Sequence, residues 1–143
     1  MDKPSRYQNA INQIAYSLCK HSPKLNPVAS MAIIASAVKV NFPEAVFVGF
    51  YIVQTDMQVL EVGPYQGRLL ACGRIAFGDG ACGTAACRQQ TVILHDVSQS
   101  INYIACDDET QSEIVVPIFI EGKLIGVLDI DSDEIAGFDE IDK

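Results

Sequence analysis

The sequence predicts an α+β domain with one mainly antiparallel β-sheet and helices packed on one of its faces. Two stretches before residue 43 have the apolar spacing of helices, whereas most later segments alternate or are rich in β-branched and aromatic residues. Short turns join several of these segments, and hairpins favour antiparallel pairing. With 143 residues and no repeat or linker, the chain 1–143 is expected to form a single domain.

Two helices are predicted in the N-terminal part of the chain. Residues 5–20 place apolar side chains on one helical stripe that includes Cys19, which we therefore expect to be a small core residue. A second helix is expected to begin at Pro27, with Asn26 as its N-cap, and to end before Pro43. Because the second helix is the more apolar of the two, we expect it to pack against the sheet.

Three strands and a short helix are expected in the middle of the chain. Residues 45–53 are rich in β-branched and aromatic side chains, and residues 58–67 are expected to be their hairpin partner, closing in a Gly-Pro turn. Residues 69–77 alternate, which predicts a third strand that carries Cys72. After a glycine-containing turn, residues 81–88 predict a short helix.

The last third of the chain predicts a long loop followed by a hairpin. Residues 91–97 predict a short strand. Residues 98–111 show no sustained hydrophobic periodicity and predict a long loop, and long loops in compact domains often carry function. Residues 112–133 predict two strands joined by the two-residue turn Glu121-Gly122. This hairpin is the clearest strand pair in the sequence.

The charge balance and the apolar segments exclude several classes of function. The chain has 18 acidic and 10 basic residues and a net charge of −8, which argues against binding to nucleic acid or to anionic lipid. No apolar segment reaches the roughly 18 residues of a membrane span, and the N-terminal MDKPSRYQNA lacks the apolar core of a signal peptide. We therefore expect a cytoplasmic protein without a nucleic acid or membrane partner.

The cysteine pattern is typical of neither a secreted disulfide framework nor a zinc motif. The chain has 5 cysteines, an odd number, and it shows no secretion signal. No CxxC is present, and both histidines, His21 and His95, lie outside the spacings of zinc ligands. We therefore expect no metal site, and packing and redox chemistry remain as roles for the cysteines.

Three acidic residues are expected to meet where the C-terminal strands pair. Because alternate residues of a strand share a face, Asp129 and Asp131 point the same way, whereas Leu124 points the opposite way. Glu113 begins the preceding strand, which places it near the Asp pair in a hairpin. Grouped carboxylates repel, so one of them can keep its proton and act as an acid near neutral pH. The residues leave two interpretations open, a pocket for an ammonium group or a solvated strand end.

Three of the cysteines lie on segments that can converge on these acids. Cys106 lies on the loop that leads into Glu113, within an acidic stretch that raises the pKa of a thiol and makes it a poorer nucleophile. Cys82 starts a short helix, whose N-terminus stabilises a thiolate. Taken singly, Cys72, Cys82 and Cys106 each also fit the role of a small buried hydrophobe. Cys87 is expected to point elsewhere and to serve packing.

Five motifs, in order, resemble those of the free methionine-(R)-sulfoxide reductases, a GAF-domain family. They are VGFYIV, GPYQG, ACGRIAFGDGACGTA, NYIACDDETQSEIVVPI and IGVLDIDS, and the resemblance runs from about Phe47 to Asp142. Ordinary GAF domains share the fold but are not expected to carry these cysteines. The resemblance implies a sheet of about six antiparallel strands flanked by helices, and reduction of free L-methionine-(R)-sulfoxide to methionine.

The resemblance also implies roles for the cysteines and a source of electrons. Cys106 is the expected attacking residue, Cys72 the resolving one, and Cys82 a second resolving or relay thiol. Which of Cys82 and Cys106 attacks first stays open. Thioredoxin is the implied electron donor, so no cofactor is expected, and the resemblance implies a homodimer.

The substrate contacts implied by the resemblance use the acids and two aromatic residues. Glu113 is the expected proton donor to the sulfoxide oxygen, and Asp129 and Asp131 are expected to hold the ammonium, although these roles can exchange. Tyr51 is expected to line the pocket. Phe47 is expected there too, at a position where the family usually has Trp.

Two further functions remain open, and one more departure from the family is visible. The chain ends at GFDEIDK, where relatives continue into a C-terminal helix, so that helix is expected to be absent or truncated. A non-catalytic GAF module that binds a small regulatory molecule would use the same fold. A thiol redox sensor would use the same cysteines without reducing a substrate.

Overall fold

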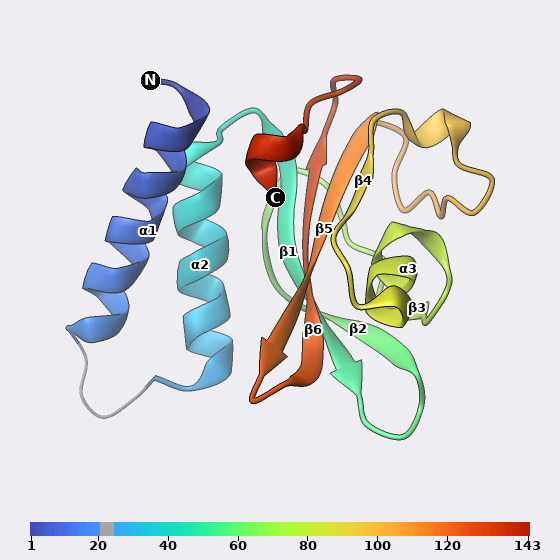
Figure 1. Cartoon of the computed structure of the whole chain (residues 1–143), viewed down its shortest axis with the longest axis horizontal. Coiled ribbons are helices and arrows are strands. Elements are labelled where there is room, and N and C mark those ends of the chain that lie inside the picture. Colours follow the sequence, from blue (N-terminus) through green and yellow to red (C-terminus); the bar gives the residue numbers. More distant parts are fainter. Residues whose placement is uncertain (21–24) are drawn as a thin grey trace.

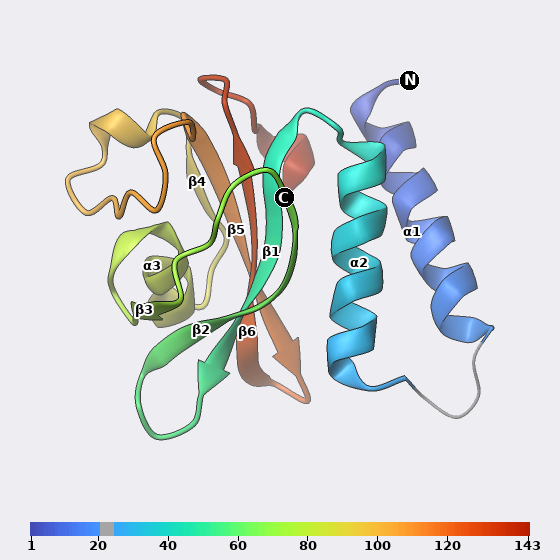
Figure 2. The ribbon, with the colours of Figure 1, turned by 180° about the vertical axis from the view of Figure 1, so that it is seen from behind.

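The computed structural model describes residues 1–20 and 25–143, and these form three layers (Figure 1). Helices α1 (Lys3–Cys19) and α2 (Pro27–Asn41) form one layer, and the β-sheet lies in the middle. The third layer is α3 (Gly80–Arg88), which lies on the opposite side of the sheet from α2 in both views (Figures 1 and 2). The predicted α+β class is confirmed.

Helix α2 begins and ends at the residues that its sequence predicts. The side chain of Asn26 accepts a hydrogen bond from the amide of Val28 at 2.7 Å, which satisfies one of the unpaired donors at the start of the helix. The helix ends at Asn41, two residues before Pro43, which disfavours helical backbone in the residue that precedes it. His21, between the two helices, lies outside the described residues.

Helix α1 is largely exposed because it packs mainly against α2 and not against the sheet. Its fully buried residue is Ala10, and Ile11 of the predicted apolar stripe is 56% exposed. Cys19 is exposed as well, so the prediction that it is a small core residue is wrong. An apolar stripe fills a core only where another layer covers it, and α1 lies at the outside of the molecule (Figure 1).

A six-stranded antiparallel sheet forms the middle layer, with the strand order β3-β2-β1-β6-β5-β4. Its strands are β1 (Ala45–Gln54), β2 (Val59–Gly67), β3 (Arg74–Ala76), β4 (Val92–Leu94), β5 (Ser112–Ile120) and β6 (Lys123–Ser132). The two central strands are β1 and β6, and β1 pairs with both β2 and β6. The expected sheet of about six antiparallel strands is confirmed.

Helices cover both faces of this sheet, so the prediction that they pack on one face is wrong. On one face, α2 contributes Ala35 and Val38 to a core with Val48 and Ile130. On the other face, α3 contributes a different core with β1, β5 and β6. The residues of α3 that lie in this core are small, namely Ala81, Cys82, Ala85 and Ala86. Small side chains let this short helix lie close to the sheet, and a short helix carries too little periodicity to be placed from sequence.

Irregular backbone occupies part of the predicted third strand. Strand β3 has only three residues, and Cys72 precedes it in irregular structure, so the prediction that Cys72 lies in a strand is wrong. The predicted Gly-Pro turn is also wrong, because Gly63 and Pro64 lie inside β2. They sit opposite Phe50, where the register between β1 and β2 shifts. Proline lacks an amide hydrogen and is tolerated at such a bulge.

The predicted C-terminal hairpin is confirmed as β5 and β6, with Glu121 and Gly122 as its turn. The pairing register shifts between Ile118 and Phe119, which places one extra residue of β6 near its start. Leu124 therefore packs against the same core as Val127, so its predicted face is wrong. None of the helices in the described part of the chain is both long enough and apolar enough to cross a lipid bilayer.

Candidate active site

A pocket opens on the α3 side of the sheet, where residues from β1, β5 and β6 face α3 and the loop that precedes β5. Its empty volume, which includes the solvent at the open mouth, is about 460 Å³. Seven of the predicted site residues line it: Phe47, Tyr51, Cys82, Cys106, Glu113, Asp129 and Asp131. The eighth, Cys72, is bonded to Cys106 at the pocket's rim.

Strand register gathers the three predicted acids at this pocket. Glu113 of β5 pairs with Asp131 of β6, and Asp129 lies two residues before Asp131 on the same face. All three are buried, with exposed fractions of 6% for Glu113, 5% for Asp129 and 9% for Asp131. The interpretation of a solvated strand end is therefore wrong, since the acids face the pocket and not bulk water.

Burial and mutual repulsion favour the protonated forms of these acids. Burial raises the pKa of Glu113 from 4.5 to about 7. Burial, followed by the charges of Asp131 and Glu113, raises the pKa of Asp129 well above its usual value. Burial, followed by Glu113 and Asp107, does the same for the pKa of Asp131. A pocket with these groups holds protons near neutral pH that it can donate.

The acids lack a cationic partner among the described residues of the pocket. Among the described residues that line it, none is Lys, Arg or His. Asp129 Oδ1 is buried, and no hydrogen-bond donor of the described residues reaches it. Since a buried carboxylate without a partner is costly, this oxygen is available to a cationic or hydrogen-donating ligand.

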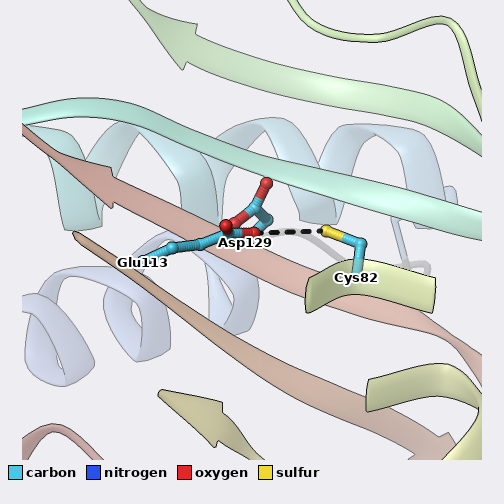
Figure 3. A group of neighbouring side chains, drawn as sticks. All are labelled: Cys82, Glu113 and Asp129. Atoms are coloured by element: carbon cyan, nitrogen blue, oxygen red, sulfur yellow. Dashed lines mark hydrogen bonds between the residues drawn. The ribbon is translucent and has the colours of Figure 1, made fainter. Parts of the chain in front are cut away.

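Cys82 projects from α3 toward the carboxylates of the sheet, as Figure 3 shows. Its Sγ lies 3.9 Å from Glu113 Oε1, and its side chain is almost fully buried. Burial, followed by the charges of Asp129 and Glu113, raises the pKa of Cys82 well above its usual value. The helix N-terminus was expected to stabilise the Cys82 thiolate, and this expectation is wrong because burial and the acids outweigh it.

Cys72 and Cys106 form a disulfide between the segment that precedes β3 and the loop that precedes β5. Their Cα atoms lie 5.3 Å apart, an ordinary separation for a disulfide. Cys106 is exposed to solvent and also lines the pocket, so it faces both the acids and an external reductant. Cys87 is exposed, which contradicts the prediction that it serves packing, and it is not among the residues that line the pocket.

Comparison with known proteins agrees with this fold and with these motifs. A family model described as "GAF domain" matches residues 29–143. The structure is similar to that of free methionine-R-sulfoxide reductase from Neisseria meningitidis in complex with its substrate, with 42% identity and a TM-score of 0.91, covering 99% of this chain and 82% of that chain. This chain belongs to the free methionine-R-sulfoxide reductases, a GAF-domain family.

Two further relatives show how far the similarity extends. The Free methionine-R-sulfoxide reductase of Saccharomyces cerevisiae is 50% identical over 97 residues, which are 66% of this chain and 53% of that protein. GAF domain-containing protein A of Dictyostelium discoideum is 40% identical over 141 residues, which are 99% of this chain and 85% of that protein. The similarity to the Neisseria reductase, which covers 99% of this chain, includes the whole sheet and the pocket.

The aromatic wall of the pocket differs from the pattern expected for the reductase family. Phe47 stands where Trp was expected, and its ring lies 5.2 Å from that of Tyr65 and 6.4 Å from that of Tyr51, centroid to centroid. Phe47 and Tyr51 are each only 2% exposed. The smaller ring thus still closes this side of the pocket as an apolar surface.

Sequence reasoning missed two polar residues of the pocket, Tyr103 and Asp107. The Asp107 carboxylate accepts hydrogen bonds from the amides of Glu109 and Thr110 and from the Thr110 hydroxyl. These contacts fix the turn that directly follows Cys106. An Asp followed three residues later by Thr is typical of such a turn, so the sequence held a signal for Asp107. No comparable signal marks Tyr103 in a loop without periodicity.

Proposed function

We propose that this chain reduces free L-methionine-(R)-sulfoxide to L-methionine through Cys106 and Cys72. The observation that carries this proposal is one pocket that combines three buried acids with a cysteine of a disulfide pair. The names of the Neisseria and yeast relatives support the substrate. A buried acid cluster favours a ligand with a free ammonium group, which an amino acid has and a residue within a peptide chain lacks.

In the proposed first step, the sulfur of Cys106 attacks the sulfur of the sulfoxide, and Glu113 protonates the sulfoxide oxygen. A Glu113 with a pKa of about 7 is a suitable acid at neutral pH. The oxygen is transferred to Cys106, which becomes a sulfenic acid, and methionine leaves as the reduced product. Asp129 and Asp131 hold the ammonium, while Phe47 and Tyr51 contact the apolar end of the substrate.

In the proposed second step, the Cys72 thiol attacks the sulfenic sulfur of Cys106. A disulfide forms and the oxygen leaves as water, so one sulfoxide and two thiols give one sulfide, one disulfide and one water. The Cys72–Cys106 bond of the structure supports this choice of pair. Thioredoxin then returns two electrons, which fits a cytoplasmic enzyme, and the exposure of Cys106 supports direct attack by a dithiol protein. Assembly as a homodimer remains a prediction.

In the test, reduced protein is mixed with one equivalent of either the R or the S epimer of the sulfoxide. The reaction is quenched with an alkylating agent, and the mass of the intact chain is measured by mass spectrometry. We expect the R epimer to remove two alkylatable thiols and the S epimer to remove none. Loss of thiols with peroxide but not with the sulfoxide would instead establish a redox sensor. Binding of the sulfoxide without loss of thiols would establish a non-catalytic module.

Variants assign the roles of the cysteines and of Glu113. Cys106→Ser should abolish thiol loss, and Cys72→Ser should accumulate a sulfenic acid that a specific nucleophilic reagent traps. Cys87→Ser, which changes an exposed cysteine outside the pocket, is the matched control and should react normally. Glu113→Gln should slow the first step by roughly 10²-fold or more. Full turnover by Cys106→Ser would move the attacking role to Cys82.

A further inference from the structure

We propose that Cys82, Glu113 and Asp129 form a binding site for Zn²⁺. Each residue offers one ligand atom, the sulfur of Cys82 and a carboxylate oxygen of each acid, and these atoms all lie within 4.8 Å of one another. The three side chains come from α3, β5 and β6 and converge from opposite sides (Figure 3). Sulfur and carboxylate oxygen are both ordinary zinc ligands.

The distances fit a tetrahedral ion after small side-chain movements. With Zn–S and Zn–O bonds of about 2.3 and 2.1 Å, the sulfur and oxygen ligands of a tetrahedral site lie about 3.6 Å apart. The observed distance from Cys82 Sγ to Glu113 Oε1 is 3.9 Å. Three protein ligands leave a fourth position, which opens to the pocket and suits a water molecule.

An independent observation also points to a cation at this place. Asp129 Oδ1 is buried and lacks a donor among the described residues. No lysine, arginine or histidine is found among the described residues that line the pocket. A divalent ion would satisfy this oxygen and would offset the repulsion between Asp129 and Glu113.

The thiol selects the class of metal ion. A thiolate is a soft ligand that favours Zn²⁺ and Cd²⁺ over Mg²⁺ and Ca²⁺, which prefer sites made of oxygen alone. When the ion binds, the Cys82 thiol and the protonated carboxyls of Glu113 and Asp129 release their protons to solvent, and the sulfur and one oxygen of each carboxylate form the bonds to the metal. No electron is transferred, so the Cys72–Cys106 disulfide is unaffected.

Zinc and the sulfoxide substrate would compete for the same atoms. The metal would occupy oxygens of Asp129 and Glu113, to which we have assigned ammonium binding and proton donation. Bound zinc therefore excludes substrate, and this inhibition rests on the proposed function. Metal binding itself does not rest on it, so the two proposals can fail separately.

The binding test uses Cd²⁺ as a spectroscopic probe. A protein with Cys19→Ser and Cys87→Ser and an intact Cys72–Cys106 disulfide has Cys82 as its single free thiol. We expect one equivalent of Cd²⁺ to produce the ultraviolet charge-transfer absorption of a cadmium–thiolate bond, and Zn²⁺ to displace it. The absence of this absorption would overturn the proposal, and so would equally strong binding of Mg²⁺.

Substitution of the metal-ligating residues distinguishes a site formed by the thiol and the acids from metal binding to the thiol alone. Cys82→Ser should lose the absorption, and Asp129→Asn should weaken Cd²⁺ binding by more than the roughly 10–100-fold expected for an outer-shell residue. Asp108→Asn, at an exposed loop residue that does not line the pocket, is the matched control and should bind normally. Circular dichroism checks that each variant is folded, and Glu113→Gln replaces Asp129→Asn if the latter is not. Unchanged affinity in the acid variant would contradict the site.

The inhibition test measures sulfoxide reduction by reduced protein at increasing Zn²⁺. We expect reduction to fall as the site fills, and added substrate to relieve the inhibition. A protein that binds zinc but does not reduce the sulfoxide would contradict only the proposed function. One that reduces the sulfoxide but does not bind zinc would contradict only this inference.

Discussion

At the scale of single residues, the raised pKa of Glu113 makes stability depend on pH. The folded protein keeps this proton up to about pH 7, whereas the unfolded carboxyl loses it near 4.5. The folded state therefore binds more protons than the unfolded state between these pH values. The contribution of protonated Glu113 to stability is complete below pH 4.5 and is lost as pH rises through 7. We expect the free energy of unfolding to fall between pH 5 and pH 8 by about a few kcal/mol.

Urea unfolding of the oxidised protein at pH 5 and pH 8 measures this effect. Glu113→Gln should reduce the fall, because a neutral amide does not titrate. Glu121→Gln, in the exposed turn between β5 and β6, is the matched control and should leave the fall unchanged. A stability that stays constant or increases toward pH 8 would contradict the pKa assignment.

A second prediction at this scale concerns the reactivity of the free thiols. Cys82 is buried and its pKa is raised, whereas Cys19 and Cys87 are exposed. We expect two fast alkylations and one that is slower by roughly 10²-fold or more at pH 8, because the thiolate is the reactive form. Intact-mass spectra over time follow the three modifications, and Cys82→Ser should remove only the slow one. Three equally fast modifications would contradict the burial of Cys82.

At the scale of elements, the position of α3 depends on Gly83. A Cβ at Gly83 would collide with the carbonyl oxygen of Ala76, which ends β3. Gly83→Ala should push α3 away from the sheet and lower the free energy of unfolding by about 1–3 kcal/mol, the usual cost of overpacking. Gly73→Ala is the matched control, because a Cβ there meets nothing within 4 Å. Urea unfolding of both variants checks the difference, and equal stabilities would contradict the close contact.

Local spacing within the strands predicts part of the site, whereas contacts between distant segments determine the rest. Alternation along β6 placed Asp129 and Asp131 on one face, and the hairpin brought Glu113 to them, because both follow from local spacing. Cys72 was misplaced because its segment alternates without pairing as a strand. The side of the sheet that α3 covers depends on contacts between distant segments, so no local pattern revealed it. Tyr103 was missed for the same reason.

At the scale of the whole molecule, the disulfide joins the short connection between β2 and β3 to the loop that precedes β5. Cys72 and Cys106 are 34 residues apart, and closing a loop of this length in the unfolded chain is worth up to about 4 kcal/mol in the chain-entropy treatment. We expect reduction to lower the free energy of unfolding by about 2–4 kcal/mol. Urea unfolding with and without a reductant measures this. Cys106→Ser should equal the reduced protein and should not respond to the reductant, and a response would point to another disulfide.

The arrangement in three layers also has a practical consequence. Exposed Cys19 is the last residue of α1, and α1 lies on the side of the sheet away from α3 (Figure 2). The pocket opens on the α3 side. Once Cys87 is replaced by serine, the oxidised protein keeps a single reactive anchor, which can be coupled to an electrode or a bead. The pocket would then face outward from the support, as an immobilised sensor for an oxidised amino acid requires.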